Sequence, residues 1–214
     1  NNTSGDRNVA LGYVALTQNS TGTFNVAIGS GASQLNSSGS SNTSLGNNSM
    51  YSNTSANYNT AIGAEALYDV ARTLDTDGYN TALGYNAGNT GTNDITTGNK
   101  NTLLGASTAA SAAAGTNQTI IGYGASGVAN NSVTIGNSDV TAWYPGADNT
   151  ADLGSSSVEF KDLYIDGTAN LDAVDIDGGA IDGSAIGANS ASTGAFTTIT
   201  ASTSMDVTGS TGII

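Results

Sequence analysis

A five-residue motif returns eight times along this chain of 214 residues, and its spacing limits the folds that the chain can adopt. Most copies read Asn, then Val or Thr, a small residue, Leu or Ile, and Gly. The closing glycines are Gly12, Gly29, Gly46, Gly63, Gly84, Gly105, Gly122 and Gly136. They lie 17, 17, 17, 21, 21, 17 and 14 residues apart, which is too short for a helical hairpin repeat and suits one coil of a β-solenoid. We therefore predict an all-β fold, a parallel β-solenoid or β-roll with one coil per interval.

Alternation within the motif predicts which side chains face a core. The residue before each glycine is always Leu or Ile, and we expect this row to point inward. The predicted core residues are Leu11, Ile28, Leu45, Ile62, Leu83, Leu104, Ile121 and Ile135. Two residues earlier, a β-branched Val or Thr shares the same face. The residue between them is mostly Ala, Ser or Thr, and we expect this opposite face to allow close approach of another element.

Gly and Asn occupy the ends of the motif. The eight glycines are predicted structural turns, because Gly adopts positive φ and lets neighbouring backbone pass closely. Asn opens six motifs, and two interpretations stay open: a ladder of amides bonded from coil to coil, or separate turn formers. The six are Asn8, Asn25, Asn42, Asn59, Asn80 and Asn101. Gln118 and Ser132 take this position in the last two motifs and are expected to interrupt a ladder.

Composition excludes several classes of function. The chain has no Cys and no His, so it lacks Ser-His-Asp and Cys-His nucleophile systems, the commonest zinc sites and any disulfide scaffold. Only 10% of the residues are charged and 6% are aromatic. A single globular core is hard to build from so few large apolar residues, whereas stacked small coils need fewer. We expect neither a cofactor nor an enzyme.

The charge is strongly acidic, with a net value of −13 from 17 acids and 4 bases. No basic patch is present to neutralise phosphate, so we expect no nucleic-acid partner. No run of about 20 apolar residues occurs, so we expect no membrane insertion. The sequence starts and stops in mid-pattern, and we expect it to be a piece of a longer protein.

The repeats resemble the head of trimeric autotransporter adhesins. The similarity rests on segments such as 25–32, Asn-Val-Ala-Ile-Gly-Ser-Gly-Ala, and 59–66, Asn-Thr-Ala-Ile-Gly-Ala-Glu-Ala, and it covers roughly residues 5–140. The resemblance implies a left-handed parallel β-roll in which three chains lie side by side about a threefold axis. We accordingly assign residues 1–139 to a solenoid head.

The character of the chain changes after the last repeat. Residues 140–150 contain its single Trp and single Pro and are predicted to form a boundary or hinge. Beyond them, 151–167 resembles a segment of phage tail-fibre proteins, and 179–199 resembles the shaft that follows it. Triplets such as Ile165-Asp-Gly bury little alone, so three chains around one axis would supply the missing core and cover the strand edges. We predict an extended β shaft at 151–214 and a homotrimeric fibre.

Four sharper site hypotheses each have a plainer structural interpretation. Spaced carboxylates at 75–78 and 175–178 fit a calcium loop but also ordinary acidic turns. Paired carboxylates serve glycosidases, although nothing marks one acid as buried. A threonine row suggests ice binding, although alternation places it inside with the Leu/Ile row. This row comprises Thr60, Thr81, Thr102 and Thr119.

The tyrosines either stack on sugars or cover coil edges and fill a trimer interface. They are Tyr13, Tyr51, Tyr58, Tyr68, Tyr79 and Tyr85. We predict no catalytic and no metal-binding residue, and the receptor-binding residues stay unknown.

The predicted function is that of a structural and host-recognition fibre. The resemblances favour a phage tail fibre that mediates attachment to the cell surface, located in the virion tail and extracellular. Its partners would be its own copies in a homotrimer, a host cell-surface glycan or protein, and other virion tail proteins. A bacterial cell-surface trimeric adhesin is the alternative. From another class, a monomeric ice- or calcium-binding solenoid stays open, and oligomeric state separates it from the fibres.

Overall fold

The computed structural model describes residues 3–70, 77–147 and 150–169. The chain divides into two compact units, Asn1–Ala151 and Asp152–Ile214. The predicted shaft belongs mostly to the second unit, and its residues 170–214 lie outside the described residues.

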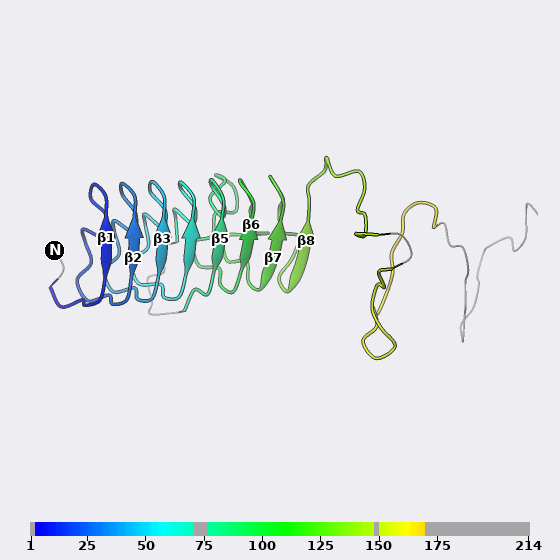
Figure 1. Ribbon diagram of the computed structural model, residues 1–214, viewed down its shortest axis with the longest axis horizontal. Coiled ribbons are helices and arrows are strands. Elements are labelled where there is room, and N and C mark those ends of the chain that lie inside the picture. Colours follow the sequence, from blue (N-terminus) through cyan, green and yellow to red (C-terminus); the bar gives the residue numbers. More distant parts are fainter. Residues whose placement is uncertain (1–2, 71–76, 148–149, 170–214) are drawn as a thin grey trace, which may run out of the picture. The chain divides into compact units, whose positions relative to one another are not determined.

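The first unit is a stack of coils that share one parallel sheet (Figure 1). The strands are β1 (Val9–Leu11), β2 (Val26–Ile28), β3 (Thr43–Leu45), β4 (Thr60–Ile62), β5 (Thr81–Leu83), β6 (Thr102–Leu104), β7 (Gln118–Ile121) and β8 (Ser132–Ile135). They pair in sequence order, and each motif aligns with the next, as in Ile28 beside Leu45. Intervals of different length therefore differ only outside the sheet. The predicted parallel β-solenoid is confirmed.

The predicted core row is wrong, because it lies on the outside of the coil. Leu11, Leu45, Leu83, Leu104 and Ile135 are exposed, and Ile28, Ile62 and Ile121 are half-buried. The middle residue of strands β2 to β6 points inward instead. Ala27, in the middle of β2, is 0% exposed, whereas the predicted core residue Leu11 is 66% exposed. The side chains alternate as predicted, but the inner and outer faces are exchanged.

The width of the coil explains this inversion. The hydroxyl of Ser33, on the wall facing the sheet, donates a hydrogen bond to the Ser44 hydroxyl on β3 across only 2.9 Å. A strand residue larger than Ala or Ser does not fit at that level. At other levels a larger residue is accommodated inside the coil: Leu16, Met50 and Leu67 stand at the position that corresponds to Ser33, and Leu103 and Ile120 point inward from β6 and β7.

Buried asparagines link the coils along the stack. The side-chain Oδ1 of one Asn accepts hydrogen bonds from both the backbone N–H and the Nδ2 of the next Asn. At Asn80 these distances to Asn59 Oδ1 are both 3.1 Å. The same pattern joins Asn25, Asn42, Asn59, Asn80 and Asn101. The ladder interpretation is therefore the right one.

The asparagine ladder changes at its end, and a second ladder runs beside it. Gln118 still donates its backbone N–H to Asn101 Oδ1 at 3.0 Å, but its side-chain amide turns to the Ser111 hydroxyl. The second ladder joins Asn19, Asn36 and Asn53 through Nδ2–Oδ1 bonds of 2.8 Å. Because a buried amide without partners is costly, both ladders fix the spacing of the coils.

The motif glycines turn the chain away from the sheet. All eight have positive φ, and Gly63 is representative with a φ of 131°. A Cβ at Gly63 would collide with the backbone carbonyl of Gly84 on the next coil. These glycines therefore allow the backbone of neighbouring coils to touch.

We expect Asn59→Ala to lower the free energy of unfolding by about 1 to 3 kcal/mol, because the Asn80 amides lose their acceptor inside the coil. Chemical denaturation followed by circular dichroism measures the change. Gln18→Ala is the control: Gln18 is exposed and lies outside the sheet, so this change should cost less than about 0.5 kcal/mol. Equal effects would contradict a stabilising ladder.

We expect Gly63→Ala to destabilise by about 2 to 6 kcal/mol, because backbone strain and overpacking act together. Gly91→Ala isolates the strain: Gly91 has a φ of 80°, but a Cβ added there would have no atom within 4 Å, so its cost should stay near about 1 to 2 kcal/mol. Thermal and denaturant unfolding of both variants gives the difference. Equal losses would show that contact with the Gly84 carbonyl is unimportant.

Candidate functional site

The outer face of the sheet presents two uncharged columns. The first, which we call the Val/Thr column, comprises Val9, Val26, Thr43, Thr60, Thr81, Thr102, Thr119 and Val133; the second, the Leu/Ile column, is the row that the sequence predicted inside. Register places their members at successive levels of the stack. Neither column contains a charged residue. The sheet thus carries an uncharged stripe along its whole length.

Two margins border this stripe. The entry margin consists of the eight residues that each lie two positions before a member of the Val/Thr column: Arg7, Phe24, Ser41, Tyr58, Tyr79, Lys100, Asn117 and Asn131. The exit margin is the residue after each motif glycine: Tyr13, Ser30, Asn47, Ala64, Tyr85, Ala106, Tyr123 and Asn137. All eight entry residues have positive φ, between 49° and 59°, as at Phe24 with 59° and Tyr58 with 57°. The same backbone conformation at each level stacks their side chains.

Aromatic and cationic side chains on neighbouring coils stack on one another. Tyr58 and Tyr79 have ring centroids 5.1 Å apart with an interplanar angle of 4°. Tyr51 and Tyr68, elsewhere on the coil, are 5.0 Å apart. The Arg7 guanidinium lies 5.0 Å from the centre of the Phe24 ring. One coil spacing is therefore a good distance for stacking and for cation–π contact.

The structure places the six tyrosines of the sequence hypotheses in two groups. Tyr51, Tyr58, Tyr68 and Tyr79 cover coil edges as two stacked pairs, whereas Tyr13 and Tyr85 stand exposed on the exit margin. Sequence reasoning missed Tyr123 on the exit margin and Phe24 on the entry margin. Their fixed offset from the motif is the signal that identifies them.

Asp77 is engaged with a tyrosine. The Tyr79 hydroxyl donates a 2.8 Å hydrogen bond to Asp77 Oδ2, and the Asn57 amide reaches Asp77 Oδ1 at 3.5 Å. This hydrogen bond, with a smaller contribution from desolvation, raises the pKa of the Tyr79 phenol above its usual 10.0. Asp75 and residues 175–178 of the calcium hypothesis lie outside the described residues.

Within the described residues, no group of three or more acidic side chains converges as a metal site would require. Among the same residues, no helix is long and apolar enough to cross a bilayer. The threonine row occupies the outer face, so the argument that placed it inside with the core is wrong.

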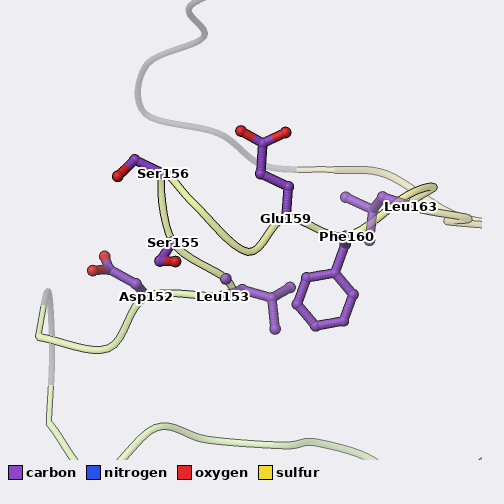
Figure 2. A pocket seen from close by; sticks show the side chains of 8 residues that line it. Asp152, Leu153, Ser155, Ser156, Glu159, Phe160 and Leu163 are labelled. Atoms are coloured by element: carbon purple, nitrogen blue, oxygen red, sulfur yellow. The ribbon is translucent and has the colours of Figure 1, made fainter.

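The described part of the second unit forms a short turn around an open hollow (Figure 2). Ser155 and Val158 form an antiparallel bridge at this turn. Leu153, Phe160 and Leu163 line the hollow yet remain exposed, and the Glu159 carboxylate points away from the Phe160 ring. The hollow is also lined by Asp152, Ser155, Ser156 and Glu159, whose side chains point in different directions, so it lacks the converging polar groups of a small-molecule site.

No protein-family model, curated protein or solved structure matches this chain. Support for a function therefore comes from the geometry of the outer face together with the sequence resemblances.

We expect Asp77→Asn to lower the pKa of Tyr79 toward its ordinary value, because the negative acceptor is removed. With the wild-type pKa raised, the folded chain keeps this proton after the unfolded chain loses it, so this contribution to stability falls as pH rises above about 10. NMR titration of ring-labelled tyrosine measures the pKa. Asp94→Asn is the control: it removes the negative charge of a carboxylate that accepts hydrogen bonds from the Thr90 and Gly91 amides, and it should leave the Tyr79 pKa unchanged. An unshifted Tyr79 pKa in Asp77→Asn would contradict the assignment.

Proposed function

We propose that this chain is a segment of a homotrimeric fibre that attaches to a cell surface, and that the outer face of its sheet is where the copies meet. The supporting observation is the exposed, uncharged stripe of Val, Thr, Leu and Ile. Isolated exposed apolar residues are ordinary, but a contiguous apolar stripe on a soluble chain marks an interaction surface.

The outer face of the sheet is large enough to take part in assembly. At about 4.8 Å per coil and about 3.3 Å per residue, the area between the two margins is roughly 700 Å². A standard pairwise interface buries about 800 Å² on each partner, so a trimer would divide this face between two smaller contacts. The chain carries a net charge of −13, yet the two central columns contain no charge, so copies can approach here without desolvating carboxylates.

The trimer and the fibre rest on the resemblances as well as on this face. The motifs resemble adhesin heads built from three chains about one axis, and 151–167 resembles a tail-fibre segment. Leu153, Phe160 and Leu163 of the second unit are also exposed, and three parallel copies would cover them in the same way. An extended shaft at 151–214 is part of this proposal.

The fibre acts mechanically and by multivalency. Three copies present identical loops, so weak contacts with a host glycan or protein add through effective concentration. We favour a phage tail fibre, extracellular in the virion tail and joined to other tail proteins, because of segments 151–167 and 179–199. A bacterial surface adhesin is the alternative that the head repeats support equally. The role is structural and binding rather than enzymatic.

A second candidate function has one observation in its favour. Five threonines form a regular column on the outer face, at Thr43, Thr60, Thr81, Thr102 and Thr119. A monomeric solenoid would present this hydroxyl and methyl array to ice. The neighbouring Leu/Ile column is less suited to a hydroxyl lattice, so we rank this candidate second.

We expect the purified wild-type chain to have the mass of three chains by light scattering, and Leu83→Lys to have the mass of one. Leu83 is exposed in the single chain, so the variant should fold but place an ammonium group in the interface. Gln18→Lys adds the same charge at an exposed position outside the sheet and should keep the trimer. A folded wild-type monomer would contradict the fibre and favour the ice- or calcium-binding solenoid.

A further inference from the structure

The exit margin contains a slot between two tyrosines. Hydrogen bonds from Ser107 N–H to the Tyr85 carbonyl (2.8 Å) and from Gly124 N–H to the Ala106 carbonyl (2.9 Å) place Tyr85, Ala106 and Tyr123 on successive coils. Tyr85 is 56% exposed and Tyr123 is 75% exposed. Between them stands only the methyl group of Ala106. A side chain from outside can therefore enter at the level of Ala106.

The width of this slot suits a cation. Two coil spacings separate the tyrosines by about 9.5 Å, so a group halfway lies about 4.8 Å from each level. Cation–π contacts form within about 6 Å of a ring centre. Arg7 shows this distance inside the chain, at 5.0 Å from the Phe24 ring on the adjacent coil. A cation in the slot would contact both tyrosine rings.

Lys100 is the available cation at this level. It stands on the entry margin at the other end of the same strand, β6, whose exit residue is Ala106. Among the described basic residues, Arg7 pairs with Asp6 and Lys161 pairs with Asp162, whereas Lys100 is exposed and forms no salt bridge. Within one chain Lys100 cannot reach the slot, because β6 and its flanking residues separate Lys100 from Ala106 by about 20 Å.

Rotational symmetry brings the two together between copies. An axis parallel to the stacking direction leaves every coil at its own level and places the entry margin of one copy beside the exit margin of the next. We propose that Lys100 of one copy inserts between Tyr85 and Tyr123 of the next copy and thereby sets the register of the assembly. This inference rests on the self-association proposed above.

Cysteine cross-linking tests this contact cleanly, since the chain has no cysteine of its own. The variant Lys100→Cys/Ala106→Cys should form disulfides between copies after mild oxidation with diamide. The two positions flank β6 at opposite ends and are about 20 Å apart, beyond the roughly 7 Å Cα limit of a disulfide, so no bridge forms within a chain. On a non-reducing gel we expect covalent trimers.

Two control pairs define the outcomes that overturn the inference. Lys100→Cys/Ala64→Cys is two coils out of register. Ser41→Cys/Lys100→Cys joins entry margins, as antiparallel copies would. Efficient products from either pair, with none from Lys100→Cys/Ala106→Cys, would overturn the parallel register while leaving self-association intact. A monomeric wild type by light scattering would overturn both proposals.

A charge-specific variant tests the cation itself without thiols. Lys100→Gln should weaken association about 2- to 30-fold per interface, as expected for loss of a cation–π contact. Lys100→Arg keeps the charge and should restore association. If Lys100→Gln and Lys100→Arg associate as tightly as the wild type, the proposed contact is overturned.

Discussion

The narrow interior of the coil is the constraint on which the rest of the structure depends. Ser33 on one wall bonds directly to Ser44 on the sheet at 2.9 Å, so the inward strand position accepts Ala or Ser over most of the stack. Interior volume this small contributes little apolar burial per coil. Hydrogen bonds stabilise the stack in addition, because backbone pairs and two asparagine ladders hold each coil at a fixed distance from the next.

The same constraint decides what lies on the outside. Small residues fill the inward strand position at most levels, and larger side chains such as Leu16, Met50 and Leu67 pack inside against them. The Leu/Ile column and the Val/Thr column occupy the other face of the strands and point outward. A single coil stack is therefore left with a long apolar face, although its net charge and polar loops favour solubility. The association of copies that we propose would resolve this conflict by giving the outward row a core between chains instead of within one. In that proposal the repeat uses one face of each strand for folding and the other for assembly.

The sequence predicted the strands, their parallel register and the glycine turns, because each copy of the motif marks one strand and its closing glycine marks the turn. It did not predict which face is inside: alternation divides residues into two sets, and placing Leu11 or Leu83 inward assumed an interior wide enough for leucine. The small residues at Ala27 and Ser44 were the better guide. The ladder from Asn19 to Asn53 was missed because it lies outside the motif, although it repeats at the same 17-residue spacing. The slot at Ala106 required the levels of separate coils to be compared.

The most direct measurement is solvent paramagnetic relaxation of the Leu, Ile and Val methyl groups in the intact wild-type protein by NMR. Leu67 and Leu103 are fully buried within the chain, and Val128 is 80% exposed, so they supply internal references. We expect Leu45, Leu83 and Leu104 to be protected like Leu67, because another copy covers them. Relaxation as strong as that of Val128 would contradict the assignment of the outer sheet face as an interface.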